Sequence, residues 1–316
     1  MDIPKYKDVV LAHERIRPYI HRTPVFTSVS INKILGCELY FKCENFQKVG
    51  AFKFRGACNA VFSPHFKDLT KGVATHSSGN HAAALALAAK MRGVPAYIVM
   101  PENAPEIKIN AVKGYGGQIT FCKPTLEARE NVLNKLKIKT GALEVHPYNN
   151  FLVISGQGTC AKEFLEEATS LDALIAPVGG GGLLSGTCIA GHGINPELKI
   201  YAGEPKGAND AFLSLKKGTI QPSINPETIA DGLLTSLGTL TFEIIKNHVA
   251  EILTVDESSI INAMRLVWER MKIVIEPSAA VPLAALLENP ENFKNKRVGI
   301  ILSGGNISPE MAAKLF

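Results

Sequence analysis

A short apolar run that ends in a turn of small residues and leads into a helix occurs three times in this sequence. The turns lie at residues 75–81 (Thr-His-Ser-Ser-Gly-Asn-His), 177–183 (Pro-Val-Gly-Gly-Gly-Gly-Leu) and 302–306 (Leu-Ser-Gly-Gly-Asn). Glycine lets a backbone approach a ligand closely, and the first amides of a helix carry partial positive charge. The pattern therefore predicts strand–turn–helix units whose turns bind an anion such as phosphate.

Apolar runs and helix-like segments alternate along most of the chain, which predicts an α/β fold built from βαβ units around mostly parallel sheets. In such a fold, ligands bind beyond the carboxyl ends of the strands. The expected strands are residues 38–43, 72–75, 96–100, 118–122, 173–177, 199–203 and 298–302. The expected helices are residues 80–92, 105–113, 125–139, 157–167, 183–192 and 257–271.

The chain length of 316 residues corresponds to roughly two domains. Residues 72–147 contain three strand–helix units with apolar content of their own. We expect these residues to form a small domain inserted into a larger one. The larger, discontinuous domain would then consist of residues 1–71 and 148–316.

The composition excludes a disordered or strongly charged protein, because 46% of the residues are hydrophobic and 20% are charged. The net charge of +5 comes from scattered Lys and Arg residues, which disfavours nucleic acid or a membrane surface as a partner. The six cysteines form no CxxC pair, which is typical of reduced thiols in a cytosolic protein. Residues 173–196 lack charged side chains but contain seven glycines, so we expect a strand, a loop and a helix start rather than a membrane span.

Glycine spacing in the second turn argues against a nucleotide-binding motif. A dinucleotide fingerprint that starts at Gly179 would need its third glycine at Leu184, and the phosphate-loop spacing of Gly181 and Gly186 is followed by Thr187 instead of lysine. The sequence also lacks the GxSxG and HExxH motifs of serine hydrolases and zinc proteases. A dinucleotide-dependent oxidoreductase is therefore disfavoured.

Lys53 stands between Phe52 and Phe54 at the expected start of a helix. Apolar neighbours and the positive end of a helix both disfavour the ammonium form and lower the pKa of the amine. A neutral amine is available for covalent chemistry with a carbonyl group. From this segment alone, an ordinary surface lysine is the competing interpretation.

Together these segments resemble the fold-type II pyridoxal-phosphate enzymes, in the serine racemase and serine/threonine dehydratase group. The resemblance runs from His21-Arg22-Thr23-Pro24 to the end of the third turn, and includes FKFRGA, SSGNH, GGGGL, IEPS and SGGN in that order. It implies a two-domain fold like that of the tryptophan synthase β subunit, with parallel and mixed sheets flanked by helices. It also implies pyridoxal 5'-phosphate as cofactor, a small amino acid as substrate, a homodimer and a cytoplasmic location.

The resemblance assigns cofactor-binding roles residue by residue. Lys53 would bind the cofactor covalently and act as a base on one face, and Phe52 would pack beside the cofactor ring. Asn80 would bind the phenolic oxygen, and the hydroxyl of Ser303 would face the pyridine nitrogen, which leaves the ring a weaker electron sink than an aspartate would. The phosphate would lie on the amides of Gly179, Gly180, Gly181 and Gly182, and the cofactor edge on Gly232 and Glu276.

The substrate carboxylate would lie at Ser77, Ser78, Asn80 and His81. Racemisation needs acid–base groups on both faces of the α-carbon, so the serine at position 78, where many threonine dehydratases have alanine, favours a two-base racemase with Lys53 and Ser78. We expect serine dehydration to pyruvate and ammonia in the same site. The alternatives are a helix-capping role for Ser78, a structural role for His81, and an L-serine/L-threonine or 3-hydroxyaspartate dehydratase without racemase activity.

The resemblance further implies a site for Mg²⁺, or for Ca²⁺ or Mn²⁺, at Glu204, Ala208 and Asp210. Without the resemblance, two acids in a surface loop are expected to be only solvated.

The sequence departs from the family at Ala51, where many relatives have serine, and at Tyr148 and Thr235, which leaves the β-substituent preference open. In the region where some animal racemases bind a nucleotide, Ser28, Lys48 and Tyr115 match, whereas polar residues are replaced by Val29, Val49 and Ala83. A non-catalytic cofactor carrier is the remaining alternative of another class.

Overall fold

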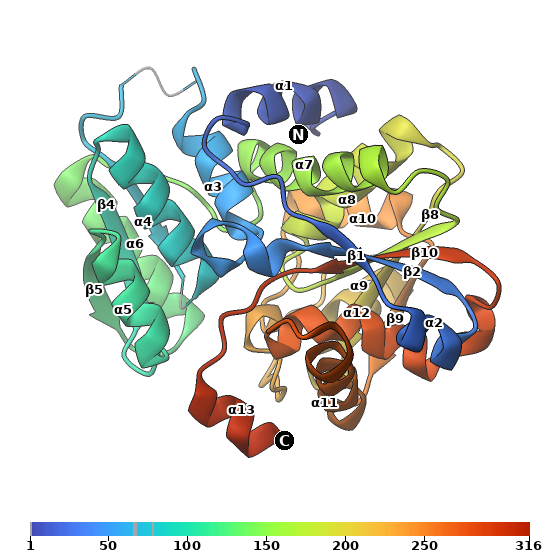
Figure 1. Ribbon diagram of the computed structural model, residues 1–316. Helices are drawn as coiled ribbons and strands as arrows, with labels where there is room; N and C mark the ends of the chain where they lie inside the picture. The colour runs from blue at the N-terminus through green and yellow to red at the C-terminus, as the bar shows by residue number, and fades with distance from the viewer. Residues whose placement is uncertain (1, 66–67, 78) are drawn as a thin grey trace.

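The computed structural model describes residues 2–65, 68–77 and 79–316. Over these residues the chain forms two sheets flanked by helices, which confirms the predicted α/β fold class (Figure 1). The larger sheet has the strand order β1-β2-β10-β7-β8-β9, and the smaller one has the order β5-β4-β3-β6. The strands of the larger sheet are β1 (Val25–Thr27), β2 (Glu38–Cys43), β7 (Ala173–Pro177), β8 (Lys199–Pro205), β9 (Glu251–Val255) and β10 (Arg297–Leu302).

In the larger sheet, β1 pairs with β2 in antiparallel orientation and the other described pairs are parallel. The parallel neighbours β2, β10, β7 and β8 therefore bring their carboxyl ends to one edge. The segments that leave this edge lead to Lys53, to Ser303, to the glycine run and to Asp210. The edge thus gathers predicted site residues that lie far apart in the sequence.

The smaller sheet is wholly parallel in its described pairs and carries its own helices, at the left of Figure 1. Its strands are β3 (Val73–His76), β4 (Ala96–Pro101), β5 (Gln118–Cys122) and β6 (Leu143–Glu144), and the helices between them are α4 (Asn80–Arg92), α5 (Glu106–Gly114) and α6 (Leu126–Thr140). An apolar cluster joins α4 to α3, through Phe54 and Ala57, so these residues pack against the small sheet's helices.

The remaining helices surround the larger sheet. They are α1 (Tyr6–Ile16), α2 (Val29–Leu35), α3 (Lys53–Val61), α7 (Phe151–Glu167), α8 (Gly182–Ile194), α9 (Asp210–Lys217), α10 (Thr239–His248), α11 (Glu257–Leu266), α12 (Pro277–Glu288) and α13 (Pro309–Leu315). Short 3₁₀ turns occupy η1 (Glu44–Phe46), η2 (Lys48–Gly50), η3 (Lys206–Ala208), η4 (Asp231–Leu233) and η6 (Pro290–Asn292), and the π-helical turn η5 (Val267–Met271) continues α11.

Several elements were not among those predicted from sequence periodicity: β1, β6, β9, α1, α2, α9, α10, α12 and α13. The strands β1 and β6 have three and two residues, which is too short for an alternating pattern. The helix α12 begins with Pro277 and contains Pro282, which interrupts the helical pattern, and most of its residues are buried, so it has no amphipathic stripe. The expected helix at residues 257–271 changes to the π-helical turn after Leu266.

Helix α7 packs against α3 and α8 with the backbones in close contact. A Cβ atom placed on Gly156 would lie 2.7 Å from the Arg55 carbonyl oxygen, and one placed on Gly186 would lie 2.4 Å from the Gly158 nitrogen. Side chains at these positions would push the helices apart. Because α3 begins at Lys53 and α8 begins at Gly182, α7 sets the spacing between the lysine and the glycine run.

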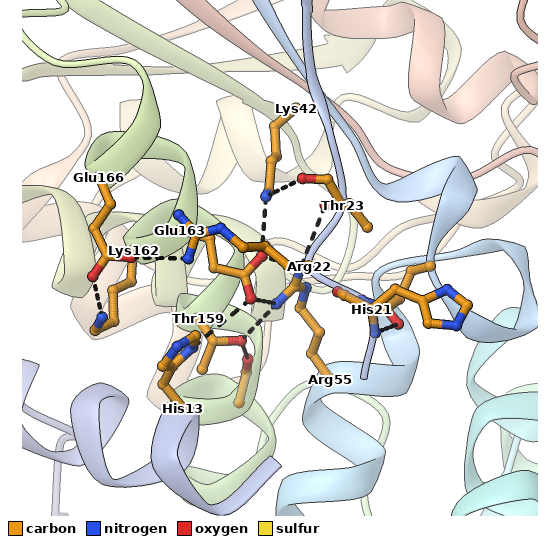
Figure 2. A network of polar contacts seen from close by, with 12 residues as sticks. His13, His21, Arg22, Thr23, Lys42, Arg55, Thr159, Lys162, Glu163 and Glu166 are labelled. Atoms are coloured by element: carbon orange, nitrogen blue, oxygen red, sulfur yellow. Dashed lines mark hydrogen bonds and ion pairs between the residues drawn. The ribbon is translucent and has the colours of Figure 1, made fainter. Parts of the chain in front are cut away.

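A buried ionic network fixes α3 to the larger sheet and to α7 (Figure 2). The guanidinium of Arg55 donates two hydrogen bonds to Glu44, at 2.7 and 2.8 Å, and two to Glu163, at 2.9 and 2.7 Å. Lys42 Nζ donates to Glu163 Oε2 at 3.0 Å and to the Thr23 carbonyl oxygen at 2.8 Å. The four charged side chains are fully or almost fully buried, and their charges balance.

This network anchors the helix face opposite Lys53. Arg55 follows Lys53 by two residues, which corresponds to about 200° around a helix of 3.6 residues per turn. Burial alone would raise the pKa of Glu163, but Arg55 and Lys42 lower it to about 2, so the pairing remains ionised at neutral pH. The rear of α3 is thus held while Lys53 faces the edge of the sheet.

None of the helices within the described residues is long and apolar enough to cross a membrane. The six cysteines are free and buried. Burial, as the largest cause, raises the pKa of the Cys43 and Cys58 thiols to about 12, so both are protonated and unreactive at neutral pH.

Replacing Arg55 by methionine should destabilise the fold strongly, because Glu44 and Glu163 would keep buried charges without their main partner. We expect the free energy of unfolding to fall by about 3–5 kcal/mol in a urea titration. Arg22→Met is the matched control, since the Arg22–Glu166 pair is 54% and 41% exposed and should contribute less than about 1 kcal/mol. Equal losses in both variants would contradict this role of the network.

Candidate active site

Lys53 lies at the carboxyl-end edge of the larger sheet because the segment before it pairs with the segment after β10. Ala51 forms a bridge with Gly304, and the Phe52 amide donates to the Ser303 carbonyl oxygen at 3.0 Å. This pairing brings Lys53, Phe52 and Ser303 together at one edge of the sheet. The Lys53 ammonium also lies 5.1 Å from the centre of the Phe52 ring.

The Lys53 amine is held in a site that favours its neutral form. Its Nζ atom donates to the Pro147 carbonyl oxygen at 3.0 Å. Burial lowers the pKa of Lys53 to about 8, and the nearby Glu276 carboxylate opposes this shift. A substantial fraction of the amine is therefore neutral near physiological pH, which is the form needed for a nucleophile or a base.

Asn80, Glu276 and Asn306 form a chain of hydrogen bonds beside Lys53. Asn80 Nδ2 donates to Glu276 Oε1 at 2.8 Å, and Asn306 Nδ2 donates to Asn80 Oδ1 at 2.9 Å. Glu276 Oε2 is buried and has no hydrogen-bond partner among the described residues. Burial is the largest cause that raises the pKa of Glu276, to about 7. The open oxygen marks a place where a ligand can donate a proton or a hydrogen bond.

The glycine run Gly179–Gly182 connects β7 to α8 in a tight turn. Gly181 has φ of 87°, a left-handed conformation that favours glycine. A Cβ atom on Gly180 would lie 2.3 Å from the Tyr148 ring. The first amides of α8 lack intrahelical acceptors, as in any helix, and can bind an anion at the positive end of the helix. The turn is therefore suited to a phosphate group.

Gly232, which the resemblance assigned to the cofactor edge, lies beside this turn. A Cβ atom on Gly179 would lie 3.3 Å from the Gly232 carbonyl oxygen. The Gly232 amide donates to Ser278 Oγ at 3.0 Å. Its neighbour Asp231 forms an ion pair with Lys108 of α5, which links the larger sheet's side of the site to the smaller sheet's helices.

The turn at residues 75–81 starts α4 next to these groups. The Ser77 amide donates to the Val99 carbonyl oxygen at 3.0 Å, and Ser77 Oγ accepts from the Gly79 amide at 3.3 Å. His81 is buried in the first turn of α4, and its Nε2 lies 3.1 Å from the Val145 carbonyl oxygen. Ser78, the predicted second acid–base group, lies outside the described residues.

The segment after β6 crosses the whole site, and sequence reasoning assigned it no contact role beyond specificity at Tyr148. The carbonyl groups of Val145 and Pro147 bind His81 and Lys53, and Tyr148 packs on the glycine run. His146 Nδ1 accepts hydrogen bonds from two amides, including that of Asn149 at 2.9 Å. No sequence motif marks this segment. Asn306, by contrast, lies within the SGGN motif, but the sequence predicted no role for it.

A cavity of about 250 Å³ opens beside Asn80, between α4, α5 and the third turn. Tyr115, Val49 and Ala83, three of the residues compared with nucleotide-binding relatives, are among its lining residues, and Ser28 and Lys48 are not.

Arg129 of α6 lies close enough to His76 and Tyr148 to affect the pKa of both side chains. Arg129 Nε is buried without a hydrogen-bond partner among the described residues.

The predicted metal residues lie together at the start of α9. Both oxygens of Glu204 accept hydrogen bonds at 2.8 Å, from the Ala211 and Phe212 amides. Burial is the largest cause that raises the pKa of Glu204 to about 8 and that of Asp210 to about 6. Asp210 Oδ2 is buried without a hydrogen-bond partner in the part of the chain that the structure describes. Two buried carboxyl groups, one of them with an unsatisfied oxygen, fit a hard divalent ion.

These two carboxyl groups and the Ala208 backbone make a sparse set of ligands. Within the described residues, no cluster of three or more His, Cys, Asp or Glu side chains is arranged to hold a metal ion. A site here would therefore depend on the Ala208 carbonyl group and on water molecules to complete its coordination.

The described groups also fit a planar, phosphate-bearing carbonyl cofactor. They offer an amine with a lowered pKa at Lys53, an amide-lined turn at the glycine run, and an unsatisfied carboxyl oxygen at Glu276. The hydroxyl of Ser303, 3% exposed, is a neutral group at the same edge.

Comparison with known proteins shows the family to which this chain belongs. The pattern of the family described as pyridoxal-phosphate dependent enzyme matches residues 16–304. The chain is 53% identical to a serine racemase from Dictyostelium discoideum, over 98% of this chain and 97% of the relative. It is 52% identical to a β-hydroxyaspartate dehydratase from Paracoccus denitrificans, over 97% of this chain and 98% of the relative.

Among solved structures, maize serine racemase superposes with a TM-score of 0.96 at 45% identity, and the match covers 99% of this chain and 97% of that one. The motif resemblance, the fold and the site geometry thus agree with the match of the family pattern. The chain belongs to the pyridoxal-phosphate dependent enzymes of fold type II.

Proposed function

We propose that this protein is a serine racemase that also dehydrates serine to pyruvate and ammonia. The observation that carries the proposal is the Lys53 amine, whose pKa of about 8 suits a base, set among the glycine run, Asn80 and Glu276. The high identity to a serine racemase over nearly the full chain supports the choice of substrate. Serine at position 78 supports racemisation beside elimination.

In this proposal the chain's residues bind the substrate and move its α-proton. Bound pyridoxal phosphate withdraws electrons from the α-carbon of the substrate and so acidifies the α-proton. Lys53 Nζ takes or returns this proton on one face, and Ser78 Oγ does so on the other. The amides that begin α4, at Asn80 and His81, hold the substrate carboxylate with Ser77 and Ser78.

The proposed cofactor contacts are those that the resemblance implies. The amides of residues 179–182 hold the phosphate, and Phe52 packs beside the ring. Asn80 donates to the phenolic oxygen, while Gly232 and Glu276 line the edge. The neutral hydroxyl of Ser303 faces the pyridine nitrogen and leaves the ring a moderate electron sink.

A dehydratase of 3-hydroxyaspartate is the second candidate. The relative from Paracoccus denitrificans carries that name, and Arg129 places a guanidinium group near His76 and Tyr148. A guanidinium can bind a second carboxylate, which 3-hydroxyaspartate has and serine lacks. If the first candidate lacks racemase activity, it becomes a dehydratase of L-serine and L-threonine.

We also propose three features of the whole protein. Glu204, Ala208 and Asp210 bind Mg²⁺, or Ca²⁺ or Mn²⁺ in its place. Residues 72–147 act as a small substrate-gating domain against a cofactor-binding domain of residues 1–71 and 148–316. The protein works as a cytoplasmic homodimer, a location with which its six free, buried thiols agree.

Purified holoenzyme should convert L-serine into D-serine and, in parallel, into pyruvate. A chiral product assay on L- and D-serine, threonine and 3-hydroxyaspartate measures both activities and ranks the substrates. Lys53→Ala should abolish them, because Lys53 supplies both the covalent link to the cofactor and the base on its face. Pyruvate without D-serine would sink the racemase proposal, and a preference for 3-hydroxyaspartate would favour the second candidate.

Ser78→Ala should remove racemisation and spare elimination from L-serine, since elimination needs only the base on the Lys53 face. The ratio of D-serine to pyruvate formed from L-serine measures this directly. Equal loss of both products would contradict the two-base assignment.

Covalent uptake of pyridoxal phosphate by the cofactor-free protein should rise with pH through a midpoint near 8. The lowered pKa of Lys53, about 8 instead of 10.5, makes its neutral amine available above that pH. Glu276→Gln should move the midpoint lower, because the carboxylate that favours the ammonium form is removed. The measurement is the initial rate of cofactor absorbance change from pH 6 to 11, with Lys53→Ala as control, and a midpoint near 10.5 would contradict the burial argument.

Removal of divalent ions should lower the melting temperature by several degrees, and Mg²⁺ should restore it, because an ion that binds only the folded state stabilises it. Differential scanning fluorimetry with and without chelator gives the shift. Asp210→Asn should respond to neither treatment. A wild-type melting temperature that ignores both chelator and Mg²⁺ would count against Glu204 and Asp210 as ligands.

A further inference from the structure

The His81 imidazole has a defined tautomer. Its Nε2 lies 3.1 Å from the Val145 carbonyl oxygen, and because a carbonyl can only accept, Nε2 carries the proton. Burial, with a smaller effect of the Lys53 charge, lowers the pKa of His81 to about 3, so the ring is neutral in the physiological range. Nδ1 therefore has no proton and presents a lone pair.

This lone pair has no donor in the described part of the protein. Nδ1 is buried, and none of the described residues gives it a hydrogen bond. The His81 side chain is almost fully buried, with 1% of the residue exposed. A buried acceptor without a donor costs about 1–3 kcal/mol, which a bound ligand with an O–H or N–H group would recover.

The His81 imidazole and the Lys53 amine bind to the same short backbone segment. His81 Nε2 binds the carbonyl group of Val145, and Lys53 Nζ binds that of Pro147, 3.0 Å away. These carbonyl groups are two residues apart in the segment that continues β6, where the Val145 amide still bonds to Ala74. The charge of Lys53 also contributes to the lowered pKa of His81, so the imidazole and the amine lie near each other.

The substrate offers few groups that can donate to Nδ1. On the proposed function, its amino group is joined to the cofactor, and its carboxylate is only an acceptor. The β-hydroxyl is then the remaining donor. In the proposed function, the substrate carboxylate accepts hydrogen bonds from the backbone amides that begin α4.

We infer that His81 Nδ1 accepts a hydrogen bond from the β-hydroxyl group of the substrate, and that His81 thereby selects β-hydroxy amino acids. This inference rests on the proposed function. It gives the imidazole a role different from the carboxylate binding that its place in the SSGNH motif implied. A β-hydroxyl acceptor serves serine, threonine and 3-hydroxyaspartate alike, and disfavours alanine.

Two substitutions separate the two ring nitrogens. His81→Gln places an amide N–H near the position of Nε2 and keeps the bond to Val145, but removes the acceptor at Nδ1. His81→Asn places an acceptor near Nδ1 and gives up the bond to Val145. The dissociation constants of L-serine and L-alanine, which differ only in the β-hydroxyl, are measured for each holoenzyme from the rapid absorbance change of the bound cofactor.

The preference for serine over alanine should fall about tenfold in His81→Gln and stay within about threefold of wild type in His81→Asn. An unchanged preference in His81→Gln would overturn the inference. An equal loss of affinity for both amino acids would also overturn it, because Nδ1 would then serve a group of the protein. The binding ratio does not depend on which products form, so absence of D-serine would refute the racemase proposal without touching this test.

A measurement on the wild-type holoenzyme covers the case in which the variants do not fold. With ¹⁵N-labelled histidine, the Nδ1 resonance of His81 should lie in the range of an unprotonated nitrogen. It should move upfield when L-serine binds and stay in place with L-alanine. A protonated Nδ1, or the same shift with both amino acids, would overturn the inference.

Discussion

The pairing of Arg55 with Glu44 and Glu163 is the interaction on which the site depends. A guanidinium and two carboxylates without water must be fully matched, since each charge alone in the interior would cost several kcal/mol. All three are buried, and the bidentate geometry leaves little freedom to rotate or slide. The orientation of α3 relative to β2 and α7 follows from that match, and with it the direction from which Lys53 enters the site.

The second constraint is the close contact between helices at Gly156 and Gly186, which acts together with the ionic network. The network fixes how α3 is turned, and the glycines fix how near α3 and α8 come to α7. Neither feature touches a ligand. Both decide whether an amine on one helix and a row of amides at the start of another lie at the spacing of one small cofactor.

Local sequence features predicted much of this site, and contacts between distant segments made up the rest. The glycine run and Lys53 could be found because each is recognisable from a few adjacent residues in the sequence. The Asn80–Glu276 and Asn80–Asn306 bonds join residues 196 and 226 positions apart, so no local pattern reveals them. The segment at residues 145–149 acts mainly through backbone carbonyl groups, which every residue carries. The tautomer of His81 depends on one of those carbonyl groups and could not be known beforehand.

The division of contacts between the helices has a mechanical consequence. Helix α7 positions Lys53 and the glycine run relative to each other, while Asn80 and His81 begin α4 of the smaller sheet. On the proposed contacts, the site would therefore take groups from both sheets. A tilt of the smaller sheet would then alter the contacts to the substrate carboxylate and, through Asn80, one contact to the cofactor ring, while the lysine and the glycine run would keep their spacing.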